Sequence, residues 1–544
     1  MYPCQDPRIN HRILQDHPYP VDFSAKKEQR EPHVGAEKSS SFGVTSMLPP
    51  EVWAEVFLYC LPEPPPANGP HPWYNRDRYI SPLTAPLLLC QVCRIWREIA
   101  VTMPRLWQRL GVYVSMGTAC PAPGLADLWL SRSGSLPLIL SLHQQNESNL
   151  NALVAGRILV LFIKHTSRWM DVDLYLAGSR LVLTSTSSNP VDAKMAAAPI
   201  LQRFRLRTSS RVYEKEERYI FGVIQDVPRL NDLHISRVPE LDLLGNSTVD
   251  VPWHQLGSLA LDYVPSIGTS LHVLSKCERL EECTIKADAL FGPLFQEPLV
   301  HTSLRSLSIN IGCDHFTAFF SRATLPALRD LSIQIRGPLE HYGWPQPCFE
   351  EFLSRSECRL ARLEIRDSGM RADQFAMCLQ HRFLQDVEEL VIDDRRDWTW
   401  DPFVKDLAFD LMNCSRCADT YAALVVLEGG YIADGAGADG GTEVDNGSGA
   451  EDGSNGNSVD GNGRLTRGRV CFLPKLLSLV VRGNCMQTSD GTISDMVESR
   501  FYFHEQNVAK LRSLKLDIPS SHLGDLQRLK WMETEGLDLD LAFI

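Results

Sequence analysis

The fold of this chain is set by a six-residue pattern whose clearest copy reads Leu304-Arg305-Ser306-Leu307-Ser308-Ile309. Apolar residues fill its first, fourth and sixth places. Because places four to six alternate with a period of two, the copy predicts a β-strand that buries Leu307 and Ile309 and turns Ser308 outward. The same pattern begins again at Leu230, Leu256, Leu328, Leu360, Leu476 and Leu511, and looser copies begin at Trp169, Leu201, Leu280 and Val387.

The copies are regularly spaced. From residue 201 to residue 387 their first residues lie 24 to 32 positions apart, a period typical of leucine-rich repeats, in which each unit supplies one strand and a return segment. A single unit cannot bury its apolar face, so neighbouring units must stack. We therefore expect one parallel sheet, with strands in chain order from about Leu201 to Leu516. The sustained period disfavours the alternative, an α/β domain with scattered leucines.

The return segments show a helical period in places. Phe316, Phe319 and Phe320 fall at i, i+3 and i+4, and so do Phe349, Phe352 and Leu353. The asparagine that regular repeats carry three positions after the pattern is replaced by Gly312, Arg336 and Ser368, and only Asn484 matches. The predicted fold class is therefore α/β, an irregular leucine-rich-repeat solenoid with a parallel sheet and helical return segments.

A different composition precedes the repeats. The stretch Leu48-Pro49-Pro50-Glu51-Val52 opens an apolar stripe that continues through Val56, Phe57 and Cys60 at helical spacing. A second stripe follows in Val92, Ile95, Trp96 and Ile99, before Pro104-Arg105-Leu106-Trp107. So short a piece buries its own stripes poorly, which leaves apolar surface for a partner.

The order Leu-Pro-x-Glu-Val, Val-Cys-Arg-x-Trp-Arg and Pro-x-Leu-Trp resembles an F-box, a small all-α module that joins substrate receptors to cullin–RING ubiquitin ligases through a Skp-type adaptor. The proline-rich insert 62–82 and the later stretch 129–138 are similar to a large fungal F-box family of the basidiomycete type. An ordinary two-helix cap is the plain alternative. The resemblance implies adaptor contacts through Leu48, Pro49, Val52, Val56, Phe57, Val92, Ile95 and Trp96, and a place for Trp107 between the F-box and the first repeats.

The expected organisation is a disordered tail over 1–46, an F-box over 47–112, a transition into irregular repeats over 113–200, and the solenoid over 201–544. The solenoid is interrupted by 434–463, a Gly-, Asp-, Asn- and Ser-rich stretch that has too few aliphatic residues to fold and should be a disordered loop. It has no EF-hand spacing that would favour calcium.

The amino-acid composition excludes several classes of function. The net charge of −13 argues against nucleic acid or an anionic membrane as a partner. The 15 cysteines are irregularly spaced, as in reduced proteins, and no apolar run approaches the length of a membrane span. We therefore expect a cytoplasmic or nuclear protein with no cofactor.

No catalytic pattern is present. The sequence has no phosphate-binding loop, nucleophile elbow or paired zinc-type histidines. His234, His254, His272 and His381 fall singly, which favours surface or turn positions. The pairs Cys90/Cys93 and Cys414/Cys417 lie far apart in the sequence; packing explains the first, and metal binding is a minor alternative for the second. The interpretation is a non-enzymatic receptor. The rival interpretation, a hydrolase hidden in an irregular domain, would need a clustered nucleophile and base, and the sequence shows none.

The resemblance implies a function for both parts of the chain. The F-box would bind the Skp-type adaptor, and through it the cullin, while the repeats hold an unidentified target protein. Outward strand residues would contact the target, namely Arg205, Ser308, Ser332, Glu364 and Val391. The alternation of Arg203, Arg205 and Arg207 is a solvated face or a contact for an acidic ligand. The alternative is a repeat scaffold that never joins a ligase.

Overall fold

The computed structural model describes residues 48–62, 83–146, 148–177, 197–208, 222–224, 227–236, 251–264, 266–287, 297–336, 344–394, 402–415, 471–483, 485–502 and 508–543. The predicted tail 1–46, nearly all of the insert 62–82 and the loop 434–463 lie outside these ranges. The chain divides into two compact units, Met1–Val52 and Trp53–Ile544. All strands of the described residues belong to the second unit.

Among the described residues, three short helices precede the sheet: α2 (Pro50–Tyr59), α3 (Leu89–Val92) and α4 (Arg94–Thr102). Proline begins α2 at little cost because the first amide groups of a helix lack intrahelical partners. Cys93 adopts an extended conformation between α3 and α4, and its sulfur accepts a hydrogen bond from the main chain of Trp96, which starts α4. A 3-10 turn, η4 (Pro104–Trp107), leads into the first strand.

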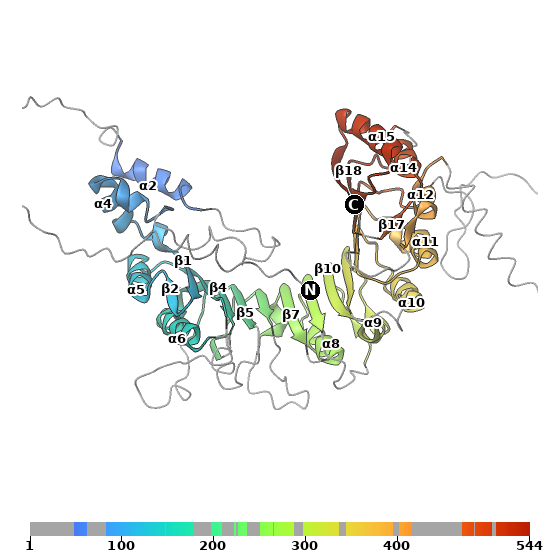
Figure 1. The fold of residues 1–544 in the computed structure, drawn as a ribbon. Helices are drawn as coiled ribbons and strands as arrows, with labels where there is room; N and C mark the ends of the chain where they lie inside the picture. The colour runs from blue at the N-terminus through green and yellow to red at the C-terminus, as the bar shows by residue number, and fades with distance from the viewer. Residues whose placement is uncertain are drawn as a thin grey trace, which may run out of the picture. The chain divides into compact units, whose positions relative to one another are not determined.

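The described residues that follow η4 form a mixed α/β structure with one large, mostly parallel sheet of 15 strands (Figure 1). Neighbouring strands follow chain order, with β2 antiparallel at one edge. The strands are β1 (Arg109–Ser115), β2 (Thr118–Cys120), β3 (Leu138–Gln144), β4 (Trp169–Leu176), β5 (Arg203–Thr208), β6 (Asp232–Ile235), β7 (Ser258–Val264), β8 (Glu282–Ala287), β10 (Ser306–Gly312), β12 (Asp330–Arg336), β13 (Arg362–Arg366), β14 (Glu389–Asp394), β16 (Ser478–Gly483), β18 (Ser513–Ile518) and β19 (Asp538–Phe543).

Helices connect many of the strands and lie on one side of the sheet (Figure 1). Their order is α5 (Pro123–Arg132), α6 (Asn149–Ile163), α8 (Ile267–Lys276), α9 (Cys313–Phe320), α10 (Gln346–Ser356), α11 (Ala372–Gln380), α12 (Asp406–Met412), α14 (Thr492–Phe501) and α15 (Leu523–Thr534). The two phenylalanine sets predicted to be helical lie on α9 and α10, and every member is fully buried. Two short parallel pairs, β9 (Leu299–Val300) with β11 (Ala323–Thr324) and β15 (Val404–Lys405) with β17 (Met486–Gln487), add further order.

The pattern found in the sequence holds the sheet together. In β10 and β12 the register pairs Leu307 with Leu331 and Ile309 with Ile333, and all four side chains are buried on the helix side. Ser308 pairs with Ser332 on the other face. The parallel, chain-order sheet is thus confirmed, and it is compatible with an α/β solenoid.

The predicted limits of the sheet were wrong at both ends. Strands begin at Arg109, not near Leu201, and β19 continues the sheet to Phe543. The strands β1, β3 and β19 lack an aliphatic first place in the pattern, which holds Trp107, Pro137 and Gly536. Their fourth and sixth places still pair with buried positions of the neighbouring strands.

Candidate interaction surfaces

Aromatic side chains hold α2 against α4. Trp53 and Phe57 of α2 both contact Trp96 of α4, with ring centroids 4.9 and 5.0 Å apart. Phe57 is fully buried, while Trp53 and Trp96 are half-buried against the same core. One side of each helix is therefore committed to packing within the chain.

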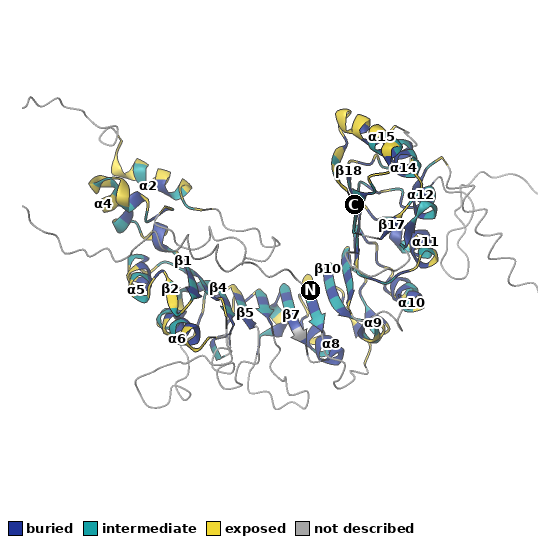
Figure 2. Cartoon of the chain, viewed as in Figure 1, coloured by how far each residue is buried: buried dark blue, intermediate teal, exposed yellow. Residues whose placement is uncertain are grey.

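Neighbouring positions on the same helices remain uncovered. Val56, next to Phe57, is 40% exposed, and Ile95, next to Trp96, is 44% exposed. Val92 at the end of α3 is 52% exposed, and Leu88 and Tyr59 are exposed as well. Figure 2 shows α2 and α4 mostly exposed or half-exposed, whereas buried and half-buried positions alternate along the strands. Large apolar side chains placed so closely in sequence and left in water are typical of a docking surface.

The residues predicted to contact an adaptor therefore separate into two groups. Val56, Val92 and Ile95 are exposed, and so are Leu48, Pro49 and Val52 in the other compact unit. Phe57 is buried and Trp96 is half-buried, because their rings join the two helices. The prediction that Phe57 is a surface anchor was wrong for this conformation. The spacing located the apolar residues but not the side of the helix that packs inward.

Trp107 joins the helices to the sheet. Its indole N–H donates a 2.7 Å hydrogen bond to the carbonyl of Ala100 in α4, and its ring packs edge-on against Trp129 of α5. The same arrangement recurs one unit later, where the indole of Trp169 donates to the carbonyl of Phe162 in α6 over 3.0 Å. Each tryptophan adds a donor to a carbonyl near the end of the helix that precedes its strand. Helix α4 thus stands before β1 as α6 stands before β4.

The five residues predicted to contact a target lie in one row across the sheet, because the strands pair without slippage between these positions. The row runs Arg205, His234, Ala260, Thr284, Ser308, Ser332, Glu364, Val391, Val480, Lys515 and Asp540. Every member faces away from the helix-covered side of its strand.

Members of this row differ in what they can offer a ligand. Ser308 and Ser332 are half-exposed. Glu364 is buried beneath Arg362 and Arg366, which both pair with its carboxylate, and Val391 is also buried. Glu364 and Val391 are therefore poorly placed for a direct contact. The arginines at i−2 and i+2 lie on the same face of the strand as Glu364 and cover it. The sequence of the strand alone does not reveal this covering, because it does not show which face is buried.

The alternating arginines already have carboxylate partners. Arg203 pairs with Asp171 at 2.6 Å, Arg205 pairs with Asp232 at 3.2 Å, and a single nitrogen of Arg207 lies 2.6 and 2.7 Å from the two carboxylate oxygens of Asp173. The neighbouring strands supply all three acids. Aligning the copies that begin at 169 and 201 places Asp171 opposite Arg203, a signal that sequence reasoning missed. Most of the positive charge is therefore neutralised within the sheet.

A column of stacked rings lies beside these ion pairs on the same face. The rings of Tyr113, His143 and Tyr175 stack at centroid distances of 5.2 and 4.7 Å, with interplanar angles of 7° and 10°. Burial and the nearby Arg207 guanidinium lower the pKa of His143 to about 4, although Asp173 opposes the shift. The imidazole is neutral at pH 7, as stacking between two phenol rings favours. No pattern in one strand marks this column, because each strand supplies one ring.

The low pKa of His143 predicts an acid-sensitive stability. In an unfolded chain the imidazole takes up its proton near pH 6.5. Between pH 6.5 and about 4 the unfolded state therefore binds a proton that the folded state does not, so stability falls as the pH falls through this window. Because phenylalanine keeps the stack and does not titrate, His143→Phe should lose less melting temperature than the wild type between pH 6.5 and 4.5. Equal losses in the two proteins would contradict this assignment.

His234 is not a solitary histidine. Its Nε2 lies 2.8 Å from Asp262 on the next strand, and Lys286 approaches the same carboxylate at 2.9 Å. Burial alone would raise the pKa of Asp262, yet the hydrogen bonds and charges of His234 and Lys286 lower it to about 2. His381 occupies a turn position, at the start of the 3-10 turn η9 (Arg382–Leu384); it is buried, and its ring accepts a hydrogen bond from the main chain of Phe383. Asp262, the partner of His234, comes from the next strand, about one repeat away in the sequence.

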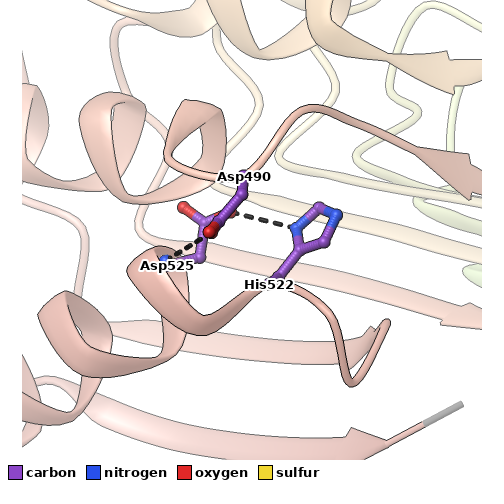
Figure 3. A group of neighbouring side chains, drawn as sticks. All are labelled: Asp490, His522 and Asp525. Atoms are coloured by element: carbon purple, nitrogen blue, oxygen red, sulfur yellow. Dashed lines mark hydrogen bonds and ion pairs between the residues drawn. The ribbon is translucent and has the colours of Figure 1, made fainter.

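Asp490, His522 and Asp525 form the most compact acid–histidine cluster in the described residues (Figure 3). Asp490 accepts hydrogen bonds from the amides of Gly524 and Asp525 in the first turn of α15, and these amides lower its pKa. Asp525 accepts from the amide of Ser494 in the first turn of α14 and pairs with His522 at 3.1 Å. All four carboxylate oxygens thus cap helix starts or bind the histidine, a structural role.

Comparisons with known proteins add no family. No model of a protein family matches the chain. No curated protein matches it either. Among the helices in the described ranges, none has the length and apolar composition needed to cross a membrane.

Proposed function

We propose that the chain is the substrate-recognition subunit of a cullin–RING ubiquitin ligase of the SCF type. Its F-box segment, residues 47–112, binds a Skp-type adaptor, and the repeats bind a target protein. The observation that supports this proposal best is the set of exposed apolar side chains on the short helices, Val56, Val92 and Ile95 foremost. They fall within the stretch whose residue order resembles an F-box.

The energetics favour a partner for these side chains. Fully burying one valine or isoleucine side chain contributes roughly 1.5–3 kcal/mol, so three such residues could anchor an interface. The inner sides of the same helices are fixed by the Trp53, Phe57 and Trp96 rings and by the hydrogen bond from Trp107. A rigid, preformed surface loses little entropy on binding. The exposed Arg94–Glu98 ion pair supplies a polar rim close to Ile95.

The repeats supply the second half of the function. The face of the sheet that points away from the helices combines half-exposed serines, compensated charges and stacked rings, the mixed chemistry of a surface that recognises protein. The subunit itself performs no catalysis in this proposal; the ubiquitin-transfer chemistry belongs to other subunits. The cytosol or the nucleus, where such ligases act, is the proposed location.

Co-purification tests the proposal. The tagged full chain is expressed with a Skp-type adaptor and a cullin, and both should be retained on the tag. The cullin should be lost when the adaptor is omitted, because the adaptor bridges the two. If the folded chain retains neither, the ligase proposal fails and a repeat scaffold that works without a ligase takes its place.

A further inference from the structure

Two cysteines that lie far apart in the sequence meet in space. Cys414 follows α12, Cys471 precedes β16, and the stretch 415–470 separates them. Their sulfur atoms lie 3.2 Å apart, and both are thiols. Cys471 is buried, whereas Cys414 is partly exposed. The pair therefore combines a partly exposed cysteine with a buried one.

Helix α14 holds both cysteines through two consecutive residues. The hydroxyl of Ser499 accepts a 3.1 Å hydrogen bond from the main-chain N–H of Cys414. The next residue, Arg500, is fully buried and places Nη2 3.5 Å from the sulfur of Cys471. The main chain beside Cys471 is fixed as well, since Phe472 donates to the carbonyl of Leu411 over 3.1 Å. The close approach of the sulfurs is thus built into ordered structure.

This environment suits thiol chemistry. The thiolate is the reactive form of cysteine, and a neighbouring guanidinium favours it. A disulfide has its sulfurs about 2.0 Å apart, so bond formation needs an approach of about 1 Å, which side-chain rotation can supply. Disulfides are rare in reduced compartments, and those that form there are usually transient and responsive to oxidants.

We propose that Cys414 and Cys471 form a reversible disulfide when the protein meets a peroxide. The partly exposed thiol of Cys414 attacks hydrogen peroxide, becomes a sulfenic acid and releases one water. The thiol of Cys471, beside Arg500, then gives up its proton as its sulfur attacks the sulfenic sulfur, and the expelled hydroxide combines with that proton to give a second water. The two sulfurs lose two electrons in total, which reduce the peroxide, and a dithiol reductant restores both thiols.

The disulfide would close the stretch 415–470 into a covalent loop. A closed loop has less freedom in the unfolded state, so the oxidised protein should melt at a higher temperature than the reduced one. This effect gives a readout independent of ligase assembly.

The test uses the purified, reduced full chain. It is treated with hydrogen peroxide, remaining thiols are blocked with N-ethylmaleimide, and peptides are mapped by mass spectrometry without reduction. A peptide linking Cys414 to Cys471 should appear and should vanish after dithiothreitol. Cys414→Ser and Cys471→Ser should each abolish it, whereas Cys417→Ser should leave it intact. Oxidation should raise the melting temperature of the wild type and of Cys417→Ser, but not of Cys414→Ser.

The controls separate this proposal from general oxidation. Cys60 and Cys120 are exposed thiols on other parts of the chain and should remain open to N-ethylmaleimide or reach higher oxidation states without joining either cysteine. Circular dichroism confirms that each serine variant folds. A link from Cys414 to Cys417, or sulfonic acid at Cys414 with Cys471 still a thiol, would overturn the proposal.

Discussion

The double substitution Val92→Asp with Ile95→Asp should weaken binding of a Skp-type adaptor by more than about a hundredfold. Both side chains are exposed, so the change removes apolar contact area without opening a cavity in the chain. Each aspartate would place an unpaired charge in a water-poor interface, which costs more than the lost contacts alone. The measurement is the adaptor affinity of wild type and variant at matched circular dichroism.

A matched control separates docking from a general effect of added charge. Leu128 on α5 and Leu523 on α15 are 43% and 67% exposed, so Leu128→Asp with Leu523→Asp makes the same chemical change on other helices. This control should bind the adaptor as the wild type does. Trp96→Asp is a poorer choice, because Trp96 also packs against Trp53 and Phe57. Equal binding by wild type and the Val92/Ile95 variant would remove these residues from the interface.

The largest loss of stability is expected from Arg500→Leu. The guanidinium is fully buried and donates to the carbonyls of Met412, Leu473 and Phe472 at 2.8, 3.0 and 2.6 Å. Met412 ends α12, so the cation also meets the negative end of that helix dipole. Leucine would remove a charged donor from all three carbonyls, of which that of Leu473 also accepts from the main-chain N–H of Leu476. The free energy of unfolding should therefore fall by about 3–5 kcal/mol. Urea denaturation followed by circular dichroism measures this loss.

Arg528→Leu provides the comparison. This arginine, on the neighbouring helix α15, pairs with Asp495 at 2.6 Å and with Glu498, and its side chain is 36% exposed. Ion pairs of this kind contribute at most about 1 kcal/mol. If the two substitutions lowered the free energy of unfolding by similar amounts, the buried hydrogen bonds of Arg500 would not have the large stabilising effect expected here.

The positions of most strands could be predicted from the sequence because buried apolar residues recur at the same places in each repeat. Copies such as Leu304/Leu307/Ile309 mark strands because each buried place recurs in every unit. Strands β1 and β3 were not predicted, because Trp107 and Pro137 occupy the first place of their pattern, where an aliphatic residue was expected. Trp107 is buried nonetheless, and its indole hydrogen bond takes the place of aliphatic packing.

The surfaces were less predictable, for a different physical reason. A helical period shows which residues share a stripe, but not which edge of it packs inward, and so Phe57 and Val56 were expected to play one role. The partners of Arg207 and His234 lie on other strands, and no local pattern pairs them. The same holds for Cys414 and Cys471, which a helix distant in sequence brings together.

The most direct test of the central claim is a titration of the purified full chain with a purified Skp-type adaptor by isothermal calorimetry. We expect saturable one-to-one binding with a dissociation constant at or below about 1 μM, equivalent to roughly −8 kcal/mol. Binding should be lost with Val92→Asp and Ile95→Asp and kept with Leu128→Asp and Leu523→Asp. Absence of binding at tens of micromolar, by a chain whose circular dichroism shows it to be folded, would contradict the assignment of this chain as a ligase subunit.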